Sequence, residues 1–260
     1  DIIFLTRNYL SKEPVMKNKL LEKTFLVLEA IAASPEPVSL KDLSTTLGLN
    51  ISTASRITAD LVEAGYVTKS GYRHFEAALG LIRLGQNAIN SSPLPRTVNP
   101  LIRAKAEALG VHGAFAGIQH GQLVYLYRSD LFSQNQMYGL PCQVPFHRSN
   151  IAIVILSQAF SREEAVQKLM DSARNDNADP AYLNEERELL EKLVDSVLTN
   201  GYLLRMEPNK RWNICFPVRC KEIYYGVSFY GDAADTRNFD RLLFECSLLT
   251  SRIRNLLGEE

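Results

Sequence analysis

A short polar run at residues 50–56 carries the side chains best suited to recognising another molecule by hydrogen bonding. Its polar members are Asn50, Ser52, Thr53, Ser55 and Arg56. Hydroxyl and amide groups both donate and accept hydrogen bonds, and a guanidinium donates in a planar fork. These groups match the base edges and phosphates exposed in the grooves of DNA. The nearest acidic residues, Asp60 and Glu63, come later in the same segment. The run therefore predicts contact with DNA.

The polar run needs a helix to present it, and residues 51–64 have the required period. Apolar positions fall on one face, and Ser52 and Arg56 project from the opposite face. The predicted buried face consists of Ile51, Ala54, Ile57, Thr58 and Leu61. The helix should thus bury one side and leave the polar run exposed.

A second helix precedes this one. Ser39 is a predicted N-cap, with Asp42 at the reciprocal position of a capping box. Gly48 is the residue type that best ends a helix in the left-handed conformation. Only residues 48–50 separate the two helices, so they must cross steeply. This is the pattern of a helix-turn-helix.

The flanking segments extend the motif. Residues 19–33 have the apolar period of a further helix, ended by the prolines of residues 34–37. Residues 66–69 and 72–75 are predicted strands joined by a tight turn at Ser70-Gly71, which makes a wing. The predicted DNA-binding residues are Ser39, Asn50, Ser52, Thr53, Ser55, Arg56, Lys69 and Arg73.

Several sequence blocks in this region point to one family. They are L-E-A-I-A at 28–32, S-L-K-D-L-S-T-T-L-G-L at 39–49, S-T-A-S-R at 52–56, L-V-E-A-G-Y-V at 61–67 and L-G at 84–85. Together they resemble the isocitrate-lyase-regulator, or IclR, family of bacterial transcription factors. The resemblance implies a DNA-binding regulator whose second domain binds an effector.

At 260 residues the chain is long enough for two domains. Residues 1–18 are left as an unassigned N-terminal arm, 19–78 form the predicted winged helix-turn-helix, 79–94 a linker helix and 95–260 a second domain. The Ser-Pro-rich segment 91–95 should break the linker helix.

The second domain has mixed patterns. Predicted helices cover 99–109, 149–157, 161–171 and 184–199, and predicted hairpins pair 112–119 with 122–128 and 213–218 with 223–230. The fold class is α+β, and the resemblance implies a GAF-like effector-binding domain.

Candidate effector contacts come from the resemblance, through the segments at 145–153, 213–218 and 226–231. They are Ser149, Asn150, Asn213, Ser228 and Tyr230. Each of them could equally be a hydrogen-bonded core residue. We favour a packing role for Arg211 and Trp212.

Composition excludes other classes. Net charge is zero, which argues against a protein that coats nucleic acid non-specifically. No apolar run approaches the length of a membrane span and no signal peptide is recognisable, so a cytoplasmic protein without membrane contact is expected. The four cysteines form no C-x-x-C pair and the four histidines lack metal-ligand spacing, which predicts reduced thiols, no metal and no cofactor. Sequence motifs of common enzymes are missing, so no catalytic residues are assigned.

These observations predict a ligand-responsive regulator that contacts a near-palindromic double-stranded operator as a homodimer or homotetramer. The small-molecule effector is not identified by the sequence. The alternative is a helix-turn-helix used for dimerisation or protein docking, with a vestigial sensor domain.

Overall fold

The computed structural model describes residues 18–129, 144–206, 211–232 and 239–258. The predictions for residues 1–17 and for Cys142 lie outside these ranges. The chain divides into two compact units, Asp1–Ser92 and Pro93–Glu260, and each is described by itself. None of the described helices is both long and apolar enough to cross a bilayer.

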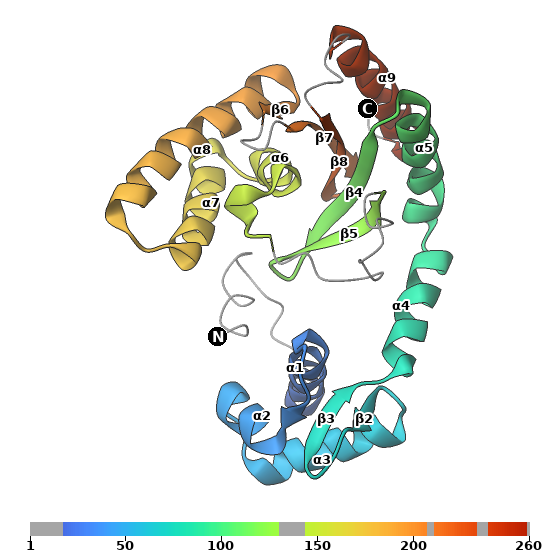
Figure 1. The fold of residues 1–260 in the computed structure, drawn as a ribbon, viewed down its shortest axis with the longest axis vertical. Helices are drawn as coiled ribbons and strands as arrows, with labels where there is room; N and C mark the ends of the chain where they lie inside the picture. The colour runs from blue at the N-terminus through green and yellow to red at the C-terminus, as the bar shows by residue number, and fades with distance from the viewer. Residues whose placement is uncertain (1–17, 130–143, 207–210, 233–238, 259–260) are drawn as a thin grey trace. The chain divides into compact units, whose positions relative to one another are not determined.

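The first unit is a winged helix-turn-helix followed by one more helix (Figure 1). Its elements are α1 (Lys19–Ala33), β1 (Val38–Ser39), α2 (Leu40–Leu47), α3 (Ile51–Glu63), β2 (Val67–Lys69), β3 (His74–Ala77) and α4 (Leu79–Ser91). The core between α1, α2, α3 and the sheet includes Val27, Ile31, Leu43, Ile57 and Phe75. Burial of this apolar set fixes the angle between α2 and α3.

Local signals set the ends of the helices in this unit. Ser39 and Asp42 form the capping box at the start of α2, and Gly48 ends it with φ of 63°. The Asn50 side chain caps α3 by accepting from the backbone N–H of Thr53 at 2.8 Å. These contacts satisfy backbone groups that a helix end leaves without partners.

Two features of the first unit differ from the sequence prediction. Ile51 lies on the predicted buried face of α3, but it is 55% exposed because it occupies the first turn, beyond the core. The wing turn spans residues 70–73 rather than 70–71, closed by a hydrogen bond from Ser70 N–H to the His74 carbonyl. Arg73 takes a positive φ of 57° in this longer turn.

The short strand β1 was not predicted. It pairs antiparallel with β3, placing Ser39 opposite His74, so the sheet of the wing has three strands in the order β1-β3-β2. The backbone N–H of Leu40 also donates to the carbonyl of Arg73. The start of α2 is thereby held beside the wing turn.

The second unit is α+β, as predicted, with helices on both faces of an antiparallel sheet (Figure 1). Its strands are β4 (His112–Gln119), β5 (Gln122–Arg128), β6 (Leu203–Met206), β7 (Arg211–Cys220) and β8 (Ile223–Asp232). Their order in the sheet is β5-β4-β8-β7-β6. Its helices are α5 (Pro93–Leu109), the 3-10 turn η3 (Phe146–Arg148), α6 (Asn150–Ala159), α7 (Arg162–Asp176), α8 (Pro180–Asn200) and α9 (Phe239–Leu257).

Successive side chains along each strand point to opposite faces of the sheet, so the sheet has two distinct faces. Trp212, Ile214, Phe216 and their neighbours form one core with α5 and α9. The intervening residues of β7 and β8 face α6. Gly226 allows the close approach of α6, because a Cβ there would lie 2.7 Å from Cγ2 of Ile151.

Helix α5 begins earlier than predicted. We expected residues 91–95 to end the linker helix and the next helix to start at Asn99, but α5 starts at Pro93. Prolines are tolerated in the first turn of a helix, where backbone N–H groups have no intrahelical acceptor. The break is therefore confined to Ser92, between α4 and α5.

Candidate functional sites

The exposed face of α3 carries the predicted base-contacting side chains. Ser52, Ser55 and Arg56 are exposed, and Thr53 is half-buried. The Ser52 hydroxyl donates to Oδ1 of Asn50 at 3.0 Å, in the first turn of the helix. The helix thus presents hydroxyl groups and one guanidinium to solvent while Ala54, Ile57, Thr58 and Leu61 are buried.

Asn50 and Ser39 also have structural roles. Both serve as N-caps, and the Ser39 hydroxyl donates to Oδ2 of Asp42 at 2.6 Å. The hydrogen bonds from Ser39 lower the pKa of the Asp42 carboxyl. Helix capping accounts for the hydrogen bonds of the Asn50 and Ser39 side chains, so any DNA contact that these two residues make is an additional role.

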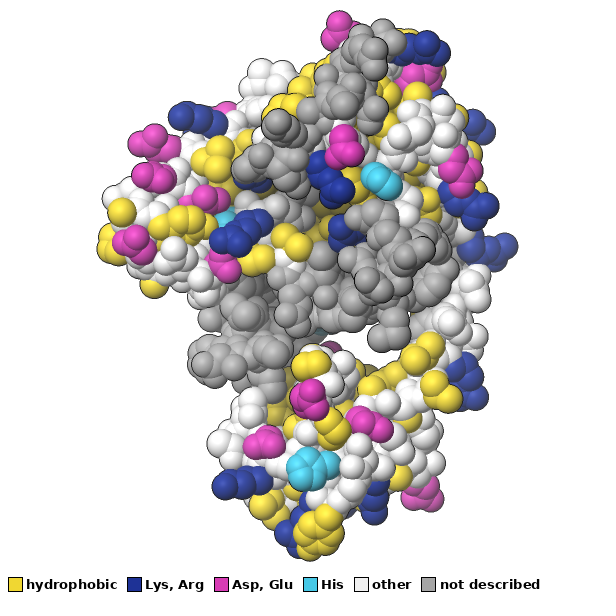
Figure 2. Space-filling view, viewed as in Figure 1, with side chains coloured by type: hydrophobic (Ala, Val, Ile, Leu, Met, Phe, Trp, Pro, Cys, Tyr) yellow, Lys and Arg dark blue, Asp and Glu magenta, His cyan; other side chains and the backbone are white. Residues whose placement is uncertain are grey.

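The turn between β2 and β3 holds the cationic part of this face. Arg73 in the turn and Lys69 at the end of β2 are exposed, and the Arg73 guanidinium lies 5.1 Å from the ring centroid of Tyr72, which is itself 81% exposed. Figure 2 shows Lys and Arg side chains around the end of this unit that carries α3 and the wing. The arrangement suits contact with a phosphate backbone.

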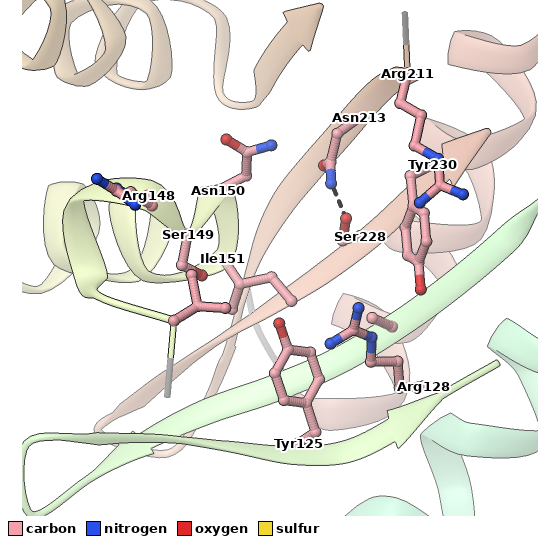
Figure 3. Close-up of a pocket in the computed structure, with 12 residues that line it drawn as sticks. Tyr125, Arg128, Arg148, Ser149, Asn150, Ile151, Arg211, Asn213, Ser228 and Tyr230 are labelled. Atoms are coloured by element: carbon pink, nitrogen blue, oxygen red, sulfur yellow. Dashed lines mark hydrogen bonds between the residues drawn. The ribbon is translucent and has the colours of Figure 1, made fainter. Parts of the chain in front are cut away.

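A cavity of about 160 Å³ lies in the second unit, between α6 and the sheet (Figure 3). All five candidate effector contacts line it, although they come from α6, β7 and β8. Strand pairing places Asn213 opposite Tyr230, and the Ser228 hydroxyl donates to Oδ1 of Asn213 at 2.9 Å. The structure therefore brings together residues that are up to 81 positions apart, from 149 to 230.

The cavity also includes residues that sequence reasoning missed. They are Ala114, Tyr125, Arg128, Val144, Arg148, Ile151 and Arg211. We favoured packing for both Arg211 and Trp212; Trp212 is fully buried, but Arg211 lines the cavity. The signal for Arg211 was its spacing of two from Asn213, which puts both on one face of a strand. No comparable signal marks Arg128 at the end of β5.

A buried polar cluster lies next to the cavity wall. His147 is fully buried, with Nδ1 3.2 Å from the Ser172 hydroxyl and Nε2 3.2 Å from the Tyr182 hydroxyl. Burial lowers its pKa to about 4 despite Asp176, whose Oδ2 lies 3.5 Å from Nε2. Arg148 binds the same carboxylate at 2.6 Å. The cluster holds η3 against α7, and the hydrogen bond to Tyr182 links it to α8.

Neither metal nor thiol chemistry has support in the described ranges. They hold no group of three His, Cys, Asp or Glu residues that could bind a metal ion. Cys215, Cys220 and Cys246 form no disulfide with other described residues. Burial raises the pKa of Cys215 and raises that of Cys246 to about 12. Both thiols are therefore protonated and unreactive at neutral pH.

The sequence of the first unit matches a known domain. Residues 20–71 match the sequence model of the IclR helix-turn-helix domain. The match covers α1, α2, α3, β2 and the first part of the wing turn, and it confirms the family resemblance of the sequence blocks at 28–67.

Solved structures extend the likeness from the IclR domain to the whole chain. An IclR-family transcriptional regulator from Brucella abortus has a TM-score of 0.75 at 16% identity, covering 98% of each chain. An IclR homologue from Microbacterium hydrocarbonoxydans, solved with 4-hydroxybenzoate, has a TM-score of 0.65 at 16% identity, covering 93% of this chain and 100% of the other. The IclR of Thermotoga maritima has a TM-score of 0.55 at 18% identity, covering 92% and 98%. The chain thus has the fold of IclR-family regulators. No curated protein sequence matches it.

Proposed function

We propose that this protein is a transcriptional regulator that binds double-stranded DNA through α3 and the wing, under the control of a small molecule bound in the second unit. One observation carries the DNA-binding part. The match to an IclR helix-turn-helix domain coincides with an α3 whose exposed face is polar and free of acidic residues over its first two turns. Such a helix suits the major groove, and the wing suits the adjacent phosphates.

The decisive experiment measures DNA binding by fluorescence anisotropy, with a duplex selected from a random pool. Arg56→Ala and Ser52→Ala should each weaken binding by about 1–3 kcal/mol, the usual cost of a lost base contact. Glu63→Ala, at the far end of α3, is the matched control. Unchanged affinity in both test variants, with the fold intact, would exclude the groove assignment.

Salt dependence separates this proposal from a docking or dimerisation module. Contacts with phosphates release counterions, so DNA affinity should fall steeply as salt rises. A protein-docking module would show little DNA affinity at any salt concentration. That result would favour the alternative function.

We further propose that two copies bind the operator together through α4. This helix has no buried residue within its unit, and Leu79, Ile82 and Ile89 project from one face at 80%, 59% and 48% exposure. Figure 2 shows hydrophobic side chains exposed along it. A second copy would cover this face, and a two-fold pair of α3 helices fits a near-palindromic site.

The cavity supports the ligand-binding part of the proposal. It combines apolar walls with convergent polar groups, the usual composition of a small-molecule site. Since a structurally similar protein was solved with 4-hydroxybenzoate, that compound is the first probe. A ligand that binds the folded state raises the unfolding temperature by mass action, and it regulates only if it favours one DNA-binding state. Thermal-shift and anisotropy measurements on the same samples test both steps.

A further inference from the structure

The wing turn, residues 70–73, carries a large aromatic side chain that packs little against the rest of the first unit. Tyr72 is 81% exposed, whereas Phe75, the next aromatic residue along the chain, is 5% exposed. An aromatic side chain stabilises a fold chiefly by burying its apolar surface, so Tyr72 contributes little to the stability of this unit. Its ring and hydroxyl are instead available to another molecule.

The backbone on both sides of this exposed ring is held by hydrogen bonds. The N–H of Ser70 donates to the His74 carbonyl at 3.0 Å, and Nδ1 of His74 donates to the Tyr72 carbonyl at 2.9 Å. The N–H of Leu40, at the start of α2, donates to the Arg73 carbonyl at 3.3 Å. The turn therefore presents Tyr72 from a fixed position beside α2.

Arg73 has a backbone conformation that disfavours a side chain. Its φ of 57° lies in the left-handed region, which glycine adopts readily and residues with a Cβ do not. Strained residues of this kind are concentrated at functional sites, where the surrounding structure holds them in place. The Arg73 guanidinium lies 5.1 Å from the ring centroid of Tyr72. The strained position thus places a cation against the exposed ring.

The charge around the ring indicates what kind of molecule it contacts. Residues 69–74 read Lys-Ser-Gly-Tyr-Arg-His and include no acidic side chain. Lys69 and Arg73 are both exposed, and such cations are attracted to phosphates. An aromatic ring between two cations suits a nucleic acid groove, which has a phosphate backbone along each side.

The dimensions of the two DNA grooves decide between them. The proposed function places α3 in the major groove, and the neighbouring minor groove, only about 6 Å wide, is too narrow for a helix. A turn that presents a single planar ring fits this space. The floor of the minor groove carries the acceptors N3 of adenine and O2 of thymine, and a G·C pair adds the N2 amino group of guanine. The hydroxyl of a tyrosine can donate to these acceptors, whereas the guanine amino group obstructs its approach.

We propose that Tyr72 contacts the minor groove beside the segment bound by α3 and selects A·T over G·C base pairs there. Its hydroxyl donates to N3 of adenine or O2 of thymine, while Lys69 and Arg73 contact the flanking phosphates. This inference rests on the proposed function, because it requires α3 to bind DNA.

The test uses base analogues that change one groove at a time, in anisotropy titrations of the full-length protein with the selected duplex. Inosine·cytosine has the minor groove of A·T and the major groove of G·C, and diaminopurine·thymine has the reverse combination. Each base pair flanking the α3 segment is replaced in turn. At the pair contacted by Tyr72, inosine·cytosine should bind within about twofold of A·T, and diaminopurine·thymine and G·C should bind roughly fivefold or more weakly. Equal affinity for all four pairs at every flanking position would overturn the inference.

Variants assign the preference to the side chain. Tyr72→Ala and Tyr72→Phe both lack the hydroxyl, so each should bind the four duplexes with affinities equal within about twofold. Because Tyr72 is exposed, neither variant should change the unfolding temperature. Phe244→Ala removes an aromatic side chain of α9 that is 64% exposed, and this matched control should keep the wild-type preference. A preference that persists in either Tyr72 variant would mean that another residue selects the base pair.

The outcomes separate this inference from the proposed function. DNA binding that is weakened by Arg56→Ala but does not respond to the minor-groove amino group would retain the regulator and reject the role of Tyr72. Absence of DNA binding by the wild type would reject both.

Discussion

At the scale of single residues, His147 shows how burial sets a protonation state. The imidazole is enclosed by Ser172, Tyr182 and Asp176, and burial lowers its pKa to about 4 from an ordinary value of 6.5. Because the unfolded chain takes up a proton near pH 6.5 and the folded chain does not, the free energy of unfolding should fall as pH decreases from 6.5 to 4. The loss should be on the order of 2–3 kcal/mol.

This prediction is checked by urea unfolding at pH 7 and pH 5. His147→Asn retains a hydrogen-bonding group but does not titrate, so its stability should depend less on pH over this interval. The control is His112→Asn, at an exposed histidine on β4. An equal pH dependence in the wild type and His147→Asn would contradict the assignment.

Arg73 offers a second prediction at this scale. Its φ of 57° suits glycine, so Arg73→Gly relieves backbone strain while losing the contact with Tyr72. The two effects offset, and stability should stay within about 1 kcal/mol of the wild type. DNA affinity should decrease, and the dependence of its logarithm on log salt should become shallower by about 1. If the slope of log affinity against log salt is unchanged in anisotropy titrations, Arg73 does not contact the phosphates.

At the scale of elements, the approach of α6 to the sheet depends on Gly226. A Cβ at this position would lie 2.7 Å from Cγ2 and 3.3 Å from Cβ of Ile151, whose branched side chain has little freedom to move. Since Asn150 and the N-cap Ser149 at the start of α6 line the cavity, displacement of α6 would change the shape of the cavity.

Gly226→Ala should therefore lower the free energy of unfolding by about 1–3 kcal/mol, the usual cost of overpacking, and weaken ligand binding. Gly85→Ala is the matched control. Gly85 lies within α4 with no neighbouring atom within 4 Å of an added Cβ, so alanine should stabilise that helix by about 0.5–1 kcal/mol. Chemical denaturation of both variants decides the comparison, and equal effects would mean that close packing at Gly226 is unimportant.

At the scale of the whole molecule, the exposed apolar face of α4 predicts self-association. A glutamate at Ile82 would place a charge in the proposed interface, where desolvation without a partner is costly. Ile82→Glu should shift the protein toward the monomer in sedimentation equilibrium and lower affinity for a palindromic duplex more than for a half-site. Ile223→Glu, at an exposed position of β8, is the control. If Ile82→Glu self-associates as strongly as the wild type, the contact between copies does not involve this face of α4.

The helix-turn-helix could be predicted from sequence because its signals are local. The capping pair Ser39 and Asp42, the left-handed Gly48 and the cap Asn50 all act within a few residues, and the structure retains each of them. The apolar period then indicates which face of α3 is buried and which is exposed. Chain geometry and backbone hydrogen bonding were sufficient to determine these elements.

The tertiary structure alone decided the composition of the cavity. Alternation along a strand tells which residues share a face, but it does not tell which strands become neighbours. The sheet order β5-β4-β8-β7-β6 brings Arg128 and Arg211 to the same cavity as Ser149, although no local pattern relates them. The sequence thus determined the helix-turn-helix and the wing through short-range interactions, whereas the charge of the cavity depends on long-range strand pairing and on the packing of α6 against the sheet.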